Sequence, residues 1–326
     1  MLIRERKSKI LNQEINLLFM EKKKNYLLLV LRGCAMGAAD VIPGVSGGTI
    51  AFITGIYEEL IESIRSINLK ALRLLGTFQL KEFWKHINGN FLISVVAGIA
   101  ISIFSLAKLM KYLLETHPLY IWSFFFGLII ISALMVSREI KKWDILTITS
   151  LIVGAIIAYT ITVLTPTSTP DDWWFILLSG AIAICAMILP GISGAFILLL
   201  LGKYEYIITA VSEFNIPILL TFLVGAVAGI VAFSHLLSWL LKNYHGMTVA
   251  LLTGFMVGSL NKIWPWKITD TELVNGIAFD VEKNVLPNTF EQVNGSDPLV
   301  WQAILMCIIG ILLIWGIEKL AVVLKK

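Results

Sequence analysis

Charged side chains are scarce in this chain of 326 residues: they make up 15% of it, whereas soluble domains carry about 25%. Histidine occurs only four times and cysteine three times. The cysteines have no neighbours at metal-ligand spacing, so no metal or other cofactor is expected. No Walker motif is present, so ATP drive is unsupported. The lack of charge excludes a soluble enzyme, a nucleic-acid-binding protein and a disordered chain.

What the chain has instead is long apolar sequence. Hydrophobic residues make up 57% of it and the mean hydropathy is +0.84. The apolar runs are unbroken, whereas a transmembrane barrel would show short alternating segments. The composition therefore predicts an all-α polytopic membrane protein embedded in a lipid bilayer.

The apolar segments follow one order twice. An interrupted region at 26–64 precedes three uninterrupted spans, and a second interrupted region at 173–211 precedes three more. The expected spans are 91–114, 119–137, 145–164, 217–241, 247–263 and 300–322.

Both interrupted regions contain the same short motif. "PGVSGG" in the first matches "PGISGA" in the second, and flanking residues match at the same offset. The matched pairs are Gly33 with Gly180, Pro43 with Pro190, Gly44 with Gly191, Ser46 with Ser193, Gly47 with Gly194, Gly55 with Gly202, Tyr57 with Tyr204 and Glu58 with Glu205. The chain is therefore predicted to be a duplication. The predicted parts are a basic segment at 1–25, repeat one at 26–164, and repeat two at 173–322 with an outer loop at 264–299.

Pro43, Gly44, Pro190 and Gly191 are predicted to break the helices. Proline removes an amide donor and glycine relaxes the backbone, so each interrupted region is expected to enter the membrane, stop and return. The second arm of the first hairpin is expected to be one helix from Ser46 to about Ile64. The rival interpretation is that each interrupted region crosses the membrane once.

The charge bias of the loops favours the hairpins. With a cytoplasmic N-terminus, hairpins place the basic stretch 65–90 in the cytoplasm and the acidic stretch 264–299 outside, as the positive-inside rule requires. The C-terminus is then also cytoplasmic. Each repeat crosses the membrane an odd number of times, so the repeats are predicted to be inverted and their tips to meet near the midplane.

Each tip presents the start of a helix after a glycine-rich turn. Backbone amides there can bind an anion, and a serine hydroxyl adds a donor. The expected substrate-binding residues of the two tips are Ser46, Gly47, Gly48, Ser193, Gly194 and Ala195. The plainer alternative is that both serines only cap their helices.

Charged residues near the hairpins complete the expected site. Arg32 and Asp40 lie in the first arm, where charges are costly, and both are expected at the substrate site. Arg32 could instead reach the membrane surface. Asp40, Glu58 and Glu205 are candidates for coupling transport to protons or another ion.

"GVSGG" also fits the pattern of a serine nucleophile. A rhomboid-like intramembrane hydrolase would need a base, and His235 is the one histidine expected inside the membrane. The motif occurs twice, which suits a symmetric tip better than a catalytic centre. No catalytic residue is therefore assigned.

The two motifs also carry a family resemblance. "GAADVIPGVSGGTIAFITGIYEELI" and "MILPGISGAFILLLLGKYEYI" resemble the bacterial domain-of-unknown-function 368 family, the PopT-type polyprenyl-phosphate translocases, over about residues 26–322. The resemblance implies return of undecaprenyl phosphate, a carrier of cell-wall sugars, from the outer to the inner leaflet of the bacterial cytoplasmic membrane. A transporter of another organic anion remains an alternative.

Overall fold

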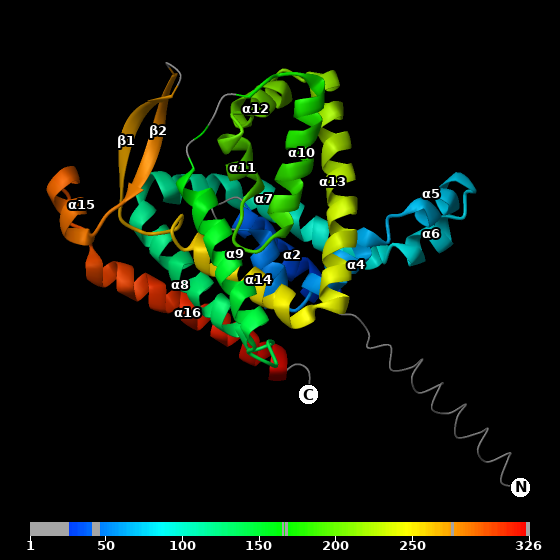
Figure 1. Ribbon diagram of the computed structural model, residues 1–326, viewed down its shortest axis with the longest axis horizontal. Coiled ribbons are helices and arrows are strands. Elements are labelled where there is room, and N and C mark those ends of the chain that lie inside the picture. The colour runs from blue at the N-terminus through cyan, green and yellow to red at the C-terminus, as the bar shows by residue number, and fades with distance from the viewer. Residues whose placement is uncertain (1–25, 41–45, 165, 167–168, 275–276, 324–326) are drawn as a thin grey trace, which may run out of the picture.

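The computed structural model describes residues 26–40, 46–164, 166, 169–274 and 277–323 (Figure 1). The chain is mostly helical, which confirms the expected class. Pro43 and Gly44, two of the expected helix breaks, lie outside the described residues, as does the basic segment 1–25.

The helices follow a similar order in the two halves of the chain. The first half contains α2 (Tyr26–Asp40), α3 (Gly47–Ile53), α4 (Tyr57–Arg65), α5 (Leu69–Gly76), α6 (Leu80–His86), α7 (Gly89–Thr116), α8 (Pro118–Ser137) and α9 (Ile145–Val163). The second contains α10 (Trp173–Ile188), α11 (Gly194–Leu200), α12 (Tyr204–Ser212), α13 (Ile216–Asn243), α14 (His245–Ser259), α15 (Pro287–Asn294) and α16 (Val300–Val323). The inversion of the halves across a membrane stays a prediction.

The two halves are interleaved by helix packing. Within each half the first arm packs on a long helix, α2 on α7 and α10 on α13. Between the halves α9 packs on α14 and α16 on α8. A methyl group at Gly225 would lie 1.9 Å from the carbonyl oxygen of Leu177, so the backbones of α10 and α13 nearly touch. Such close small-residue contacts are typical of helices packed within a membrane.

The second arm of each hairpin is bent, so the expectation of one helix from Ser46 to about Ile64 is wrong. Gly55 and Gly202 have φ values of +68° and +62°, a left-handed conformation that ends α3 and α11. Their amides and the next ones bond back to the preceding turn. The Gly194–Leu200 helix and the helix that follows it meet at 113°. The helix that follows each tip, α3 or α11, is therefore only about 10 Å long.

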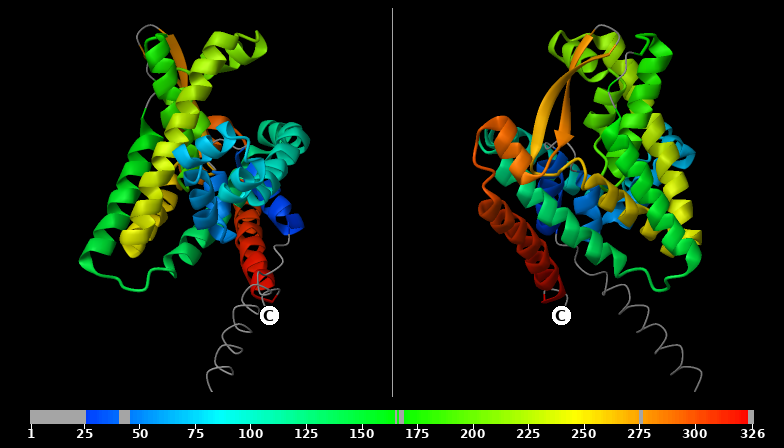
Figure 2. Two further views of the ribbon diagram at one scale, coloured as in Figure 1. Left: turned by 90° about the vertical axis from the view of Figure 1, so that its right-hand side faces the viewer. Right: turned by 60° about the vertical axis from the view of Figure 1, so that its left-hand side comes forward.

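A β-hairpin interrupts the helical order within the polar stretch 264–299. Strands β1 (Lys267–Val274) and β2 (Ile277–Asn284) pair antiparallel. A small apolar core holds the hairpin base against α8 and α16; its buried members are Leu119, Trp266 and Ala303. Figures 1 and 2 show the hairpin extending toward the end of the molecule where α12 lies.

Three helices within the described residues have the length and apolarity of a membrane span, namely α8, α9 and α13. Two bent pairs raise the number to five if each pair counts as one span. With the homologues described below, these helices identify a multi-pass membrane protein.

Candidate functional site

The two glycine-rich tips lie against each other at the centre of the molecule. Ser46 Oγ donates a hydrogen bond of 2.8 Å to the carbonyl oxygen of Met187. In return, the Gly191 amide donates one of 3.0 Å to Thr49 Oγ1. Tyr57, fully buried, donates from its hydroxyl to the carbonyl of Ile188 at 3.3 Å. The motifs form one unit, although more than a hundred residues separate them in sequence.

The first tip is closed by its own residues. The Gly47 amide at the start of α3 donates to Asp40 Oδ1 at 2.7 Å. The next amide, of Gly48, donates to Ser46 Oγ at 3.1 Å. Ser46 therefore caps its helix and is 1% exposed. Because a carboxylate oxygen already lies where an anion would meet the helix start, Asp40 occupies the expected anion position.

The second tip is built differently. Ser193 precedes α11 but makes no side-chain cap hydrogen bond to it, and Ser193 and Gly194 are buried. Ala195 is exposed and lines a cavity. Pro190 and Gly191 follow the end of α10, and Gly191 has a φ of +85°. The chain therefore breaks there, and Ala195 of this tip lines the cavity, whereas the described residues of the first tip do not.

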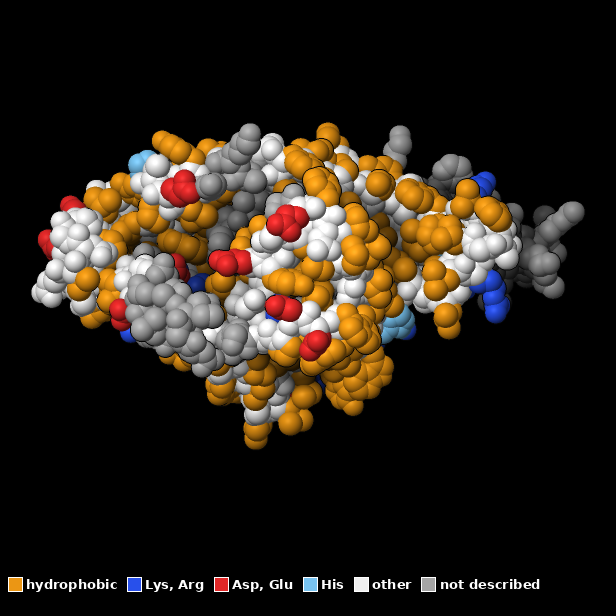
Figure 3. Space-filling model, turned by 90° about the horizontal axis from the view of Figure 1, so that it is seen from above, with side chains coloured by type: hydrophobic (Ala, Val, Ile, Leu, Met, Phe, Trp, Pro, Cys, Tyr) orange, Lys and Arg blue, Asp and Glu red, His pale blue; other side chains and the backbone are white. Residues whose placement is uncertain are grey.

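The cavity has a volume of about 860 Å³ and lies between α8, α9, α11 and the β-hairpin. Its wall combines apolar side chains with a group of charged ones. The residues used below are Trp122, Val163, Leu164, Phe196, Lys262, Lys267 and Glu282. Figure 3 looks down on this end of the molecule and shows the hollow beside the hairpin, with a basic side chain inside it.

Two lysines and one glutamate form the charged group of the cavity. Glu282 Oε2 lies 3.0 Å from Lys262 Nζ and 3.1 Å from Lys267 Nζ. The Lys262 ammonium stands 4.5 Å from the ring centre of Phe196 on α11, and that of Lys267 stands 4.0 Å from the ring centre of Trp122 on α8. Aromatic faces attract such cations. No local sequence pattern links these residues, which lie on a loop and two strands, so the sequence does not predict that they meet.

Burial alters the acid–base behaviour of this group. It lowers the pKa of Lys267 to about 8, although the carboxylate of Glu282 opposes the change. Burial alone would raise the pKa of Glu282, but Lys267 and Lys262 hold it below its ordinary value. Lys267 therefore keeps its positive charge and Glu282 its negative charge at neutral pH.

The other expected site residues are spread around the hairpins. Arg32 interacts electrostatically with Glu59 on α4, and the described residues show no ion pair between Arg32 and Asp40. Glu58 lies 3.0 Å from His245 Nε2. Glu205 is exposed on α12. The structure thus brings Asp40 to the first tip and leaves the other charges farther along the helices.

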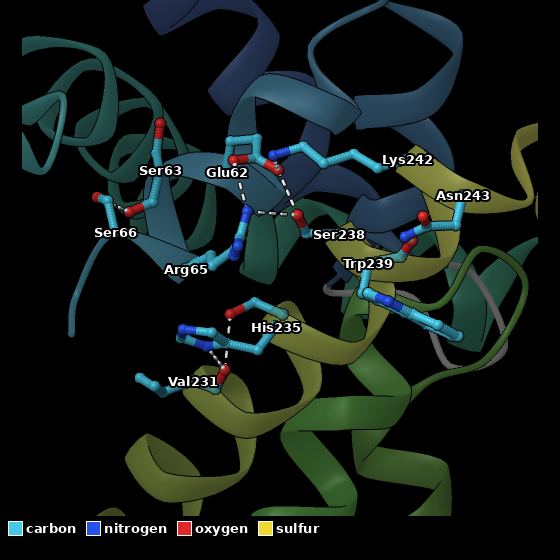
Figure 4. A network of polar contacts seen from close by, with 11 residues as sticks. Glu62, Ser63, Arg65, Ser66, Val231, His235, Ser238, Trp239, Lys242 and Asn243 are labelled. Carbon is cyan, nitrogen blue, oxygen red and sulfur yellow. Dashed lines mark hydrogen bonds and ion pairs between the residues drawn. The ribbon is translucent and has the colours of Figure 1, made fainter.

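A polar cluster joins α4 of the first half to α13 of the second (Figure 4). Glu62 accepts hydrogen bonds from Ser238 and Arg65, and Lys242 lies 3.0 Å from its carboxylate. Arg65 also donates to Ser238 Oγ at 3.1 Å. We call these four residues the α4–α13 clasp. It joins the two halves at the end of α13 where that helix leads into His245.

The clasp yields a test of local stability. Glu62→Gln removes the charge that holds Arg65 and Lys242, both partly exposed, so the loss is about 0.5–1 kcal/mol. Amide hydrogen exchange in α4 and the adjoining part of α13 is expected to speed up about 2- to 5-fold. Glu205→Gln, an exposed carboxylate on α12, is the control and should leave exchange unchanged. Equal rates in Glu62→Gln and the wild type would contradict a stabilising clasp.

Neither serine has the partner that a nucleophile needs. His235 Nδ1 bonds to the carbonyl of Val231 within its own helix at 2.8 Å, as Figure 4 shows. Ser46 bonds to Met187 and Gly48 instead. Within the described residues no histidine contacts Ser46 or Ser193, so the geometry for serine catalysis is missing.

Comparisons with known proteins agree with this picture. The family described as Undecaprenyl phosphate translocase-like matches residues 36–279. A polyprenyl-phosphate transporter of Vibrio cholerae is 51% identical over 304 residues, covering 92% of this chain and 98% of its own. A polyprenyl-phosphate transporter of Staphylococcus aureus is 35% identical over 261 residues, covering 72% and 85%. No solved structure matches the chain.

Proposed function

Because the chain belongs to the undecaprenyl phosphate translocase-like family, we propose that it returns undecaprenyl phosphate from the outer to the inner leaflet of the bacterial cytoplasmic membrane for reuse in envelope synthesis. The family and its named members are transporters, not enzymes. One observation carries the proposal: two helix starts meet, and the second lies at a cavity lined by both apolar and basic side chains.

The cavity suits a lipid with a charged head. A phosphate monoester carries about −1.5 to −2 charges at pH 7, and hydrocarbon cannot replace its hydration. Lys262, Lys267 and the backbone amides at the start of α11 can replace the water that hydrates the phosphate. The apolar side chains of Val163, Leu164 and Phe196 suit the first isoprene units, and the rest of the tail can stay in the bilayer.

Contacts between distant segments support the proposed topology. Crossing each interrupted region once would place Arg65 and Lys242 on opposite sides of the membrane, yet both bind Glu62. Single crossings would also place Thr162 and Asn261 on opposite sides of the membrane, yet their side chains are hydrogen bonded at 2.8 Å. Hairpins place each pair on one side. With cytoplasmic termini, the cavity faces outward and the α4–α13 clasp closes the cytoplasmic side.

Proton coupling is part of the proposal. For phosphate to reach the Gly47 amide, the Asp40 carboxylate must leave it. Two negative groups at one helix start repel each other, so the carboxyl gains by taking up a proton as phosphate arrives. Glu58 and Glu205 remain the alternative coupling groups.

A leaflet assay tests the proposal. Proteoliposomes carry a short-chain polyprenyl phosphate, and an external phosphatase removes the phosphate from molecules in the outer leaflet. The protein is expected to speed exchange between leaflets, so that the phosphatase also reaches the inner pool. Ser46→Ala should lower the rate about tenfold, because one hydrogen bond between the tips is lost. Protein-free vesicles are the control, and a wild-type rate equal to theirs would refute transport.

A further inference from the structure

Charge balance distinguishes one part of the cavity from the rest of its surface. Lys283 is matched by Asp270, whose carboxylate lies at 2.8 Å. Lys262 and Lys267 share the single carboxylate of Glu282, and both approach the same oxygen. One positive charge is therefore left over in a partly enclosed, aromatic-walled space, where electrostatic interactions are stronger than in water.

The site is also held in shape by its surroundings. The Lys267 side chain is 9% exposed and that of Lys262 is 18% exposed. Asn284, at the end of β2, donates to Asn261 O at 2.6 Å and to Asn261 Oδ1 at 2.9 Å. Asn261 in turn donates to Thr162 on α9. These hydrogen bonds join the base of the hairpin to α9 and so hold the strands that carry Lys267 and Glu282 beside the cavity.

Resting on the proposed function, we propose that Lys262 and Lys267 form the entry site for the phosphate head of the substrate, and that Glu282 occupies this site until the phosphate displaces it. A phosphate monoester offers three oxygens with more charge than a carboxylate, so it can bind both ammonium groups at once. The Lys262 ammonium lies over the ring of Phe196 on α11. Phe196 directly follows Ala195 of the second tip, and Lys262, Phe196 and Ala195 all line the same cavity. The phosphate can therefore pass from the lysines to the second tip within one cavity.

Substitutions that change the charge in opposite directions test the proposal. The probe is a short-chain polyprenyl phosphate, and its dissociation constant is measured with the full chain in nanodiscs. Lys267→Gln should weaken binding about 10- to 100-fold, because a charge-assisted hydrogen bond is lost. Glu282→Gln should strengthen binding several-fold, because the competing carboxylate is gone. Lys319→Gln is the matched control: Lys319 also stands over a tryptophan, Trp315 at 3.9 Å, but on α16.

Further probes identify the ligand. Inorganic phosphate should respond to the same substitutions with lower affinity, and the uncharged polyprenol should respond to none. Thermal unfolding of each variant shows that it is folded. The proposal is overturned if Lys267→Gln and Glu282→Gln shift the affinity in the same direction, or if vesicles of phosphatidylglycerol compete as well as the polyprenyl phosphate. If the wild type transports lipid while Lys267→Gln binds normally, this proposal fails and the proposed function stands. A wild type that neither binds nor transports refutes the function itself.

The pH dependence of binding provides an independent readout. The charged groups facing Lys267 are Lys262, which follows α14, and Glu282 on β2. Phosphate becomes a dianion above about pH 6, and Lys267, with a pKa of about 8, loses its charge above that pH. Affinity should therefore be highest between about pH 6 and 8 and fall at higher pH. Lys267→Arg should remove the fall, since arginine stays charged; the same fall in that variant would contradict the role of Lys267.

Discussion

A single methyl group at Gly48 is expected to abolish transport. Alanine there would place Cβ 2.2 Å from the carbonyl oxygen of Ile188, far inside van der Waals contact. The obstacle is backbone of the opposite tip, so it cannot move without separating the two motifs. We expect the leaflet-exchange rate of Gly48→Ala to fall below about a tenth of the wild-type rate, with a loss of stability of about 1–3 kcal/mol.

The control for this variant is Gly76→Ala. Gly76 ends α5, and a methyl group there meets no atom within 4 Å. Alanine in a helix is ordinarily more favourable than glycine by about 0.5–1 kcal/mol, so this variant should be neutral or slightly stabilised. Thermal unfolding and the phosphatase assay measure both variants. Normal transport by Gly48→Ala would mean that the tips need not touch.

Replacing Asp40 with asparagine is expected to remove the pH dependence of transport between about pH 6 and 8, the range in which phosphate and Lys267 keep their charges. The amide oxygen can still accept from the Gly47 amide, so the first tip keeps its shape. It carries no charge, however, and cannot take up a proton when phosphate arrives. Phosphate should bind about tenfold more tightly, because a neutral group competes less well at the helix start. Transport rates measured between about pH 6 and 8, where phosphate is a dianion and Lys267 stays charged, should then form a flat profile.

Two further variants separate coupling from structure at this position. Asp40→Ala leaves the buried Gly47 amide without its partner, which costs about 1–3 kcal/mol, so it should unfold at lower temperature than Asp40→Asn. Arg32→Ala removes a positive charge and should weaken phosphate binding without flattening the pH profile. An unchanged pH profile in Asp40→Asn would make Asp40 a cap for α3, and the coupling group would then be sought at Glu58 or Glu205.

The amino-acid sequence alone determined the class of the protein and the location of its most unusual backbone. Apolarity is a local property, so a long run of apolar residues such as that of α8 can be recognised from the sequence as a buried or membrane helix. The glycine-rich tips were equally visible, because a proline followed by several glycines is a local signal that a helix ends. The bends at Gly55 and Gly202 follow the same local rule and were within reach of sequence reasoning.

Tertiary structure alone decided which distant groups meet. The Asp40 carboxylate meets the Gly47 amide, Glu62 meets Ser238 of the other half, and Glu282 lies within reach of both Lys262 and Lys267. Helix-forming tendencies act over a few residues and say nothing about such pairs. Their partners are fixed by how α4 packs on α13 and how the hairpin base packs on α8 and α16. The charges of the cavity therefore became a site only when packing brought them into one partly enclosed space.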